Sequence, residues 1–359
     1  MKFELAVNLK TAKALGLEVP PTLLARRRGH RMTRREFISL LGGAAAIWPL
    51  AARAEQAAVP VVGFINLGVA DASANRVAAF RKGLSEAGYA EGQNVIVEYH
   101  WLEGHYERLP AVLADLVRRR VAVITTSGSA ESALAAKTAT ATIPIVFGVP
   151  EDPVKMGIVT SLARPGGNAT GINFFALEID AKRLGLMHEL LPKATRYAVL
   201  VNPANAASTQ ATSKAVKEAA RALGLDALFF NASTPAEIDA AFAAFGRERA
   251  DALFIAGDAF FFSRAVQFAT LAVRDRMPAS YATREMVEAG LLMSYGTIFL
   301  DMLRQVGIYT GSILKGTKPA DLPVLQSTKF EFVLNLQTAR SLNLDIPPML
   351  LARADEVIE

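Results

Sequence analysis

Two patterns of hydrophobic and polar residues alternate along most of the chain. Short runs rich in β-branched and aromatic residues predict buried strands at 59–67, 94–101, 121–126, 143–149 and 168–174. Between these runs, apolar residues at helical spacing, such as Val77, Phe80 and Leu84, predict helices over 73–87, 106–120, 130–138 and 153–163. Strands that alternate with helices indicate a parallel sheet with helices on both faces.

The same alternation begins again at Arg196. It predicts strands at 196–203, 226–230, 251–257 and 278–282, and helices at 208–223, 235–247 and 263–274. The sequence therefore predicts two α/β units of similar size in one chain.

A different pattern occupies residues 32–54. Arg34 and Arg35 precede an apolar run without charge from Phe37 to Ala51, and Ala52-Arg53-Ala54 follows. This order is typical of a secretory leader rather than of a buried helix, and the paired arginines resemble a twin-arginine export signal. We expect cleavage after Ala54 and a location in the periplasm, unless the leader stays uncleaved as an anchor.

Residues 1–31 contain a second copy of a segment near the other end of the chain. Lys2 to Arg26 matches Lys329 to Arg353 at 15 of 25 positions. If suitable synonymous codons encode residues 26–33, restoring two nucleotides after the codon for Arg26 would let this stretch be read as the ending Ala354 to Glu359 and a stop. We therefore hypothesise that residues 1–31 are the extraneous tail of an upstream related gene, and that Met32 is the natural start. A single repeat at this separation excludes a solenoid.

Charge and composition narrow the classes of function. The net charge is +5, but residues 1–54 hold ten Lys and Arg against three Glu, a net of +7, which leaves −2 for the rest. The basic balance therefore belongs to residues 1–54, which are the leader and the segment before it, and it indicates no nucleic-acid partner. The chain has no cysteine, which excludes disulfides and thiolate chemistry. The 305 residues after the leader suit two domains of about 150 residues each.

The motifs of common enzymes are missing from this layout. Neither G-x-G-x-x-G nor G-x-x-x-x-G-K-[ST] occurs, and the segment "TSGSAES" (Thr126–Ser132) has Glu131 where a nucleophile elbow needs glycine. His100 and His105 around Trp101 form only a weak metal pattern. We expect no cofactor, no bound metal and no enzymatic activity.

Small polar residues gather where the predicted strands end and the helices begin. In open α/β sheets, ligands bind beyond the carboxyl ends of the strands, where helix N-termini offer free N–H groups. Each candidate also has a structural explanation, as a helix cap, a core residue or a solvated arginine. The candidates for ligand binding are Ser127, Ser129, Asp152, Asn202, Asn205, Asp258, Tyr281 and Arg284.

The chain also resembles a known family. The segments "VVGFINLG", "TSGS", "ARPGGNATGINF", "VNPAN", "REMVEAGLLMSYG", "ILKGTKPADLPV" and "PPMLLARADEVIE" are similar to those of periplasmic substrate-binding proteins of ABC transporters, a family that includes tryptophan- and tyrosine-associated binders. The resemblance covers nearly all of residues 59–359.

This resemblance implies a type I periplasmic-binding-protein fold, with two Rossmann-like lobes of parallel sheets joined by a three-crossing hinge. Lobe 1 would comprise 59–173 and 294–324, and lobe 2 would comprise 174–293 and 325–359. The family's pocket adds Leu67 and Phe174 to the candidates above.

The resemblance also implies a function. A monomer would trap a small molecule between its lobes and deliver it to an ABC transporter permease, without breaking a bond. Phe174, Phe175 and Phe260 to Phe262, with the serines at a helix start, favour an aromatic amino acid or aromatic carboxylate. Two alternatives stay open: a ligand-sensing partner of a membrane receptor, and an extracytoplasmic α/β enzyme.

Overall fold

The computed structural model describes residues 59–174 and 176–359, with the side chains of all of these except residues 176–178. Val59–Glu359 form one compact unit. The predictions for residues 1–31 and for the leader at 32–54 lie outside the described residues. Within the described ranges, no helix is both long enough and apolar enough to cross a membrane.

Lobe 1 is built on a six-stranded sheet in the order β11-β5-β4-β3-β1-β2. All of its neighbouring strands are parallel. Strand order reverses beside β1, where the register pairs Asn66 with Ser127. The strands are β1 (Val61–Asn66), β2 (Ile96–Trp101), β3 (Val123–Ser127), β4 (Ile145–Val149), β5 (Ala169–Asn173) and β11 (Leu325–Gln326).

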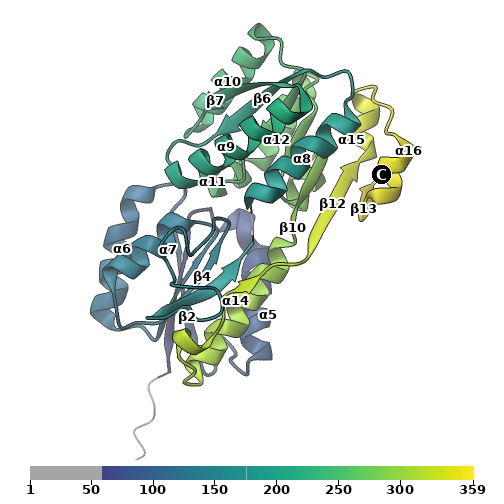
Figure 1. The fold of residues 1–359 in the computed structure, drawn as a ribbon. Helices are drawn as coiled ribbons and strands as arrows, with labels where there is room; N and C mark the ends of the chain where they lie inside the picture. The colour runs from purple at the N-terminus through teal and green to yellow at the C-terminus, as the bar shows by residue number, and fades with distance from the viewer. Residues whose placement is uncertain (1–58, 175) are drawn as a thin grey trace, which may run out of the picture. The chain divides into compact units, whose positions relative to one another are not determined.

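Two helices cover each face of this sheet (Figure 1). On one face, α6 (Leu109–Arg119) and α7 (Ala130–Ala139) bury their apolar sides. On the other face, α5 (Ala74–Glu86) packs beside α14 (Phe299–Leu314). These two helices touch backbone to backbone, since a Cβ on Gly307 would overlap the carbonyl oxygen of Phe80. Glycine is therefore required at this position for the close contact.

Lobe 2 is built on a seven-stranded sheet in the order β13-β12-β10-β9-β8-β6-β7. Strand order reverses beside β6, as it does beside β1 in lobe 1. The strands are β6 (Arg196–Val201), β7 (Asp226–Asn231), β8 (Ala252–Ile255), β9 (Ala279–Tyr281), β10 (Met293–Thr297), β12 (Phe330–Asn335) and β13 (Glu356–Ile358).

One strand pair differs from the expected parallel arrangement, because β12 runs antiparallel to β10. The reason is topological: β10 leads the chain out of lobe 2, and β12 brings it back from the same side. The other pairings in this sheet are parallel, as predicted.

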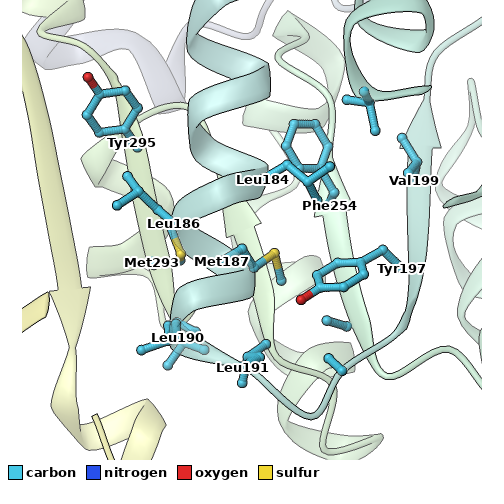
Figure 2. Packing of buried hydrophobic residues seen from close by; sticks show 14 of the residues in the cluster. Leu184, Leu186, Met187, Leu190, Leu191, Tyr197, Val199, Phe254, Met293 and Tyr295 are labelled. Atoms are coloured by element: carbon cyan, nitrogen blue, oxygen red, sulfur yellow. The ribbon is translucent and has the colours of Figure 1, made fainter. Parts of the chain in front are cut away.

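Helices pack on both faces of the lobe 2 sheet and bury two separate apolar clusters. Figure 2 shows one of them, in which Leu184 and Met187 of α8 lie against the sheet residues Tyr197 and Phe254. The helices are α8 (Ala176–Leu190), α9 (Ala206–Leu223), α10 (Pro235–Arg247), α11 (Ala259–Phe262), α12 (Ala265–Arg274), α13 (Arg284–Glu288), α15 (Leu336–Ser341) and α16 (Pro348–Arg353).

The chain passes between the two sheets three times, after β5, β10 and β11. The crossings are tied together: the Thr297 hydroxyl donates to the Phe174 carbonyl at 2.9 Å, and the Ser327 N–H donates to the Asn173 carbonyl at 2.9 Å. All of β10 belongs to the lobe 2 sheet and β11 to the lobe 1 sheet. The second and third crossings therefore follow Thr297 and Gln326, slightly later than the limits expected at 294 and 325.

The helix predicted over 153–163 is absent, and the segment between β4 and β5 consists of turns. Asp152 starts one turn through the bond from the Met156 N–H to its carbonyl, at 3.0 Å. Gly157 then adopts a left-handed φ of 71°, which ends the turn.

Candidate functional site

The two places where strand order reverses face a common cavity. In lobe 1, the side-chain amide of Asn66 donates to the Ser127 hydroxyl at 3.2 Å. In lobe 2, the side-chain amide of Asn202 donates to the Asp258 carboxylate at 3.0 Å. A cavity of about 80 Å³ lies between these strand ends and takes its lining from both lobes. This is where open α/β sheets bind ligands.

Aromatic rings form much of the cavity wall. Phe174 and Phe299 meet edge to face, with centroids 5.6 Å apart. Phe262 and Tyr281 line the cavity from lobe 2. The Tyr281 hydroxyl is held in place, since it donates to the Asp258 carbonyl at 2.7 Å and accepts from the Asp258 N–H at 3.0 Å. The wall is therefore apolar with fixed polar points.

Asp258 is one of these polar points and begins α11. Its carboxylate accepts hydrogen bonds from Asn202, from the Asn205 amide at 3.1 Å, and from the N–H groups of Phe260 and Phe261 at 2.9 and 3.2 Å. Burial raises the pKa of Asp258, and these donors act in the opposite direction. The carboxylate is thus matched by donors from its own lobe.

Asp180 of α8 is a second buried carboxylate in the lining. It accepts from the Thr212 hydroxyl at 2.7 Å and pairs with Arg183 at 3.1 Å. Arg183 also donates to the Ile255 carbonyl at 3.0 Å and lies over the Phe254 ring. Burial raises the pKa of Asp180, and Arg183 opposes the shift. Asp180 was not among the predicted residues. Its three-residue spacing from Arg183 could have indicated an ion pair on one face of a helix.

Arg76 of α5 is a buried cation in the same wall, and it too was not predicted. Its guanidinium carbon lies 3.3 Å from the centroid of Phe262 and 4.3 Å from that of Phe299. The sequence signal was its position four residues before the buried Phe80, which places both on one helix face.

Contacts between the lobes close the cavity. The Glu131 carboxylate, on α7 of lobe 1, accepts from the Ala207 N–H at the start of α9 in lobe 2, at 3.0 Å. Ser129 donates to the other oxygen of Glu131 at 2.9 Å. The Tyr106 hydroxyl of lobe 1 lies 3.4 Å from the Asp258 carboxylate. These bonds hold the two lobes in a closed arrangement.

The predicted site residues fall into three groups. Ser127, Phe174, Asp258 and Tyr281 line the cavity. Behind them, Asn202 and Asn205 hold Asp258, and Ser129 accepts from the Ser132 N–H as the cap of α7. The ligand contacts of these residues stay predictions.

Leu67, Asp152 and Arg284 form the third group, which the structure does not bring to the cavity. Leu67 is 1% exposed within the core of lobe 1. The Asp152 side chain accepts from the N–H groups of Val154 and Lys155 and is 42% exposed. Arg284 lies on the outside of lobe 2 and forms ion pairs with Glu288, Glu331 and Glu356. These three side chains are therefore not part of the cavity lining, and their expected ligand contacts stay untested predictions.

The part of the chain that the structure describes holds no cluster of three His, Asp or Glu side chains that could bind a metal ion. Cysteine is absent from the whole sequence.

Comparisons with known proteins agree with this architecture. The model of the family described as ABC transporter substrate binding protein matches residues 59–358. Members of this family work outside the cytoplasm, with a small-molecule ligand and an ABC transporter as partners. A tyrosine-binding protein of Clostridioides difficile is 26% identical over 265 residues, which are 74% of this chain and 75% of that protein.

Two solved structures are similar in fold. A conserved domain protein from Vibrio cholerae has a TM-score of 0.76 and 27% identity, covering 83% of this chain and 99% of that one. An ABC domain from Streptococcus pneumonia in complex with L-Trp has a TM-score of 0.73 and 23% identity, with the same coverage. At this identity the second likeness concerns the fold alone.

Proposed function

Because this chain belongs to the family of ABC transporter substrate-binding proteins, we propose that it captures an aromatic amino acid between its two lobes and delivers it to a membrane permease. The lobes close on the ligand, and the permease receives the closed form. Capture and release are conformational steps, and no covalent bond changes.

The aromatic composition of the cavity wall is the observation that supports this class of ligand. Phe174, Phe262, Phe299 and Tyr281 surround the space between the lobes, beside the buried carboxylate of Asp180. Aromatic rings stack favourably on other aromatic rings, and buried charged groups fix the orientation of a zwitterion. Two comparisons also support this ligand class: one relative is named a tyrosine-binding protein, and one protein of similar fold was solved in complex with L-Trp.

The closed arrangement supports the mechanism. Glu131 and Tyr106 of lobe 1 reach Ala207 and Asp258 of lobe 2 across the cavity. A ligand that touches both lobes favours the closed form by its differential affinity for that form. The hinge is short, since each crossing runs directly from one sheet toward the other lobe.

The location and assembly belong to the same proposal. The leader at residues 32–54 would export the chain through a twin-arginine pathway, with cleavage after Ala54. The mature protein would work in the periplasm as a monomer that docks on its permease.

A thermal-shift panel tests the proposal. A ligand that binds only the folded state raises the melting temperature with concentration. We expect L-tyrosine or L-tryptophan to raise it, and glucose, myo-inositol and adenosine to leave it unchanged. A response to a sugar alone, or turnover of any compound in the panel, would replace the proposal by another ligand class or by the enzyme alternative.

A further inference from the structure

Arg76 is a buried cation at the contact between the lobes. The residue is 6% exposed and lies in the cavity wall. Its guanidinium sits against Phe262 of lobe 2 at 3.3 Å and against Phe299, which packs with lobe 1, at 4.3 Å. The charge is thus placed where both lobes meet the ligand space.

No described residue neutralises this charge. Among the described side chains, which are those of residues 59–174 and 179–359, Arg76 has no hydrogen-bond or ion-pair partner, and its buried Nε has no acceptor. Burial lowers the pKa of Arg76, while Glu285 and Tyr281 act from a distance to raise it. A guanidinium nevertheless stays protonated in proteins. Among the described side chains, this desolvated positive charge therefore has no counter-charge in contact with it.

Such a charge is costly unless something offsets the lost hydration. The faces of Phe262 and Phe299 stabilise it in part through cation–π attraction. A ring face, however, does not satisfy the N–H groups of a guanidinium as an oxygen acceptor does. A carboxylate matches this fork of donors through two parallel hydrogen bonds.

The other charges in the wall already have partners. Asp180 is matched by Arg183 and Thr212. Asp258 is matched by Asn202 and Asn205, together with two backbone N–H groups. Of the described charged residues in the cavity wall, Arg76 alone lacks a polar partner. Among these described residues, the unmatched charge that a ligand meets is therefore the positive charge of Arg76.

We propose that Arg76 binds the carboxylate of the ligand. This inference deepens the proposed function and rests on it: the cavity takes aromatic amino acids with a free α-carboxylate and rejects their amides and decarboxylated amines. Because the guanidinium also packs on Phe262 of lobe 2, neutralising it favours the closed form that holds this contact.

The test uses the full chain, Arg76→Met, and a matched control, Arg81→Met. Arg81 lies on the same helix, but its side chain is 51% exposed and pairs with Glu91. Calorimetry compares L-tyrosine with L-tyrosinamide, which has the same ring and amine but no carboxylate. We expect wild type and Arg81→Met to prefer L-tyrosine by about 100-fold, the size of two charge-assisted hydrogen bonds.

In Arg76→Met we expect that preference to disappear, with L-tyrosine weakened by about 100-fold. A preference that survives in Arg76→Met would overturn the assignment. An equal loss of affinity for L-tyrosinamide and L-tyrosine would also overturn the assignment. Arg76 would then shape the cavity without binding the carboxylate.

A second measurement separates this inference from the proposed function. If wild type binds neither L-tyrosine nor L-tryptophan, the proposed ligand class is wrong, and sodium acetate serves as the probe. Stabilisation of wild type and Arg81→Met by acetate, but not by acetamide at equal ionic strength and not in Arg76→Met, would keep the carboxylate assignment. Equal responses in all three proteins would refute it.

Discussion

The bond from Glu131 to the start of α9 gives the clearest prediction about closure. Glu131→Ala removes the carboxylate of lobe 1 that accepts from the Ala207 N–H of lobe 2 at 3.0 Å. The residue is absent from the cavity wall, so the substitution acts on the lobe contact rather than on the ligand.

The magnitude follows from the kind of bond. A hydrogen bond to a charged group contributes about 1.5–3 kcal/mol. In the open form both Glu131 and the Ala207 N–H regain water, so we take the lower end, about 1.5 kcal/mol. This corresponds to a closed-to-open ratio about tenfold lower. Ligand affinity should fall by the same factor, mainly through faster dissociation, because the bound state is closed.

The assay is energy transfer between dyes on the two lobes. The chain has no cysteine. If one cysteine is introduced in each lobe, thiol-reactive dyes therefore attach at these two positions only. Lys155, with an 84% exposed side chain, and Val266, 77% exposed, are suitable positions. Stopped-flow dissociation of the bound ligand supplies the second readout.

The control is Glu218→Ala, which removes an exposed glutamate from α9 itself. It should leave closure and dissociation as in wild type. If Glu131→Ala also leaves the closed fraction and the dissociation rate unchanged, the bond to Ala207 does not hold the lobes together, and the reasoning is refuted.

Three further predictions concern stability and the site. Gly307→Ala should lower the free energy of unfolding by about 1–3 kcal/mol in urea denaturation, because its methyl group meets the backbone of α5. Burial raises the pKa of Glu151 to about 7 from an ordinary 4.5. The folded state therefore keeps a proton that the unfolded state releases, and about 3 kcal/mol of stability is lost as pH rises from 4.5 to 7; Glu151→Gln should flatten the melting temperature over this window. Asp258→Asn should weaken ligand affinity about tenfold in calorimetry, because the amide NH2 group that replaces Oδ2 cannot accept the hydrogen bonds from Asn205 and Tyr106.

Each of these three predictions has a result that would contradict it. Gly185→Ala, on α8 with open space around it, should be neutral or stabilising, so an equal loss in both glycine variants would argue against the backbone contact. A pH profile that is the same in Glu151→Gln and wild type would assign the titration to other groups. A correctly folded Asp258→Asn with wild-type affinity would remove Asp258 from the site.

The sequence pattern predicted the strands β1 to β9 and the helices α5, α6, α7, α9, α10 and α12, because both units follow simple periodicities there. It did not predict the strands β10 to β13 or the helices α8, α11 and α13 to α16. The buried face of α8 carries Asp180 and Arg183, and that of α14 carries Gly307 and Thr310. Charged and small residues interrupt the apolar stripe on which a helix prediction depends, although tertiary packing buries them.

The site was predicted in part, for a related reason. Polar residues at strand ends stand out because strands are otherwise apolar, and this signal found Ser127 and Asp258. Arg76 and Asp180 lie inside helices, where a charged residue reads as part of the solvated face. Their place in the cavity depends on the two lobes coming together, which no local pattern encodes.

The central claim is that one aromatic amino acid binds between the lobes of this protein. Calorimetric titration of the full chain with L-tyrosine and L-tryptophan tests it most directly. The account predicts saturable binding of at least one of them, with one site per chain and a negative heat-capacity change from burial of the ring. Absence of binding for both, together with saturable binding of a compound that has no aromatic ring, would contradict it.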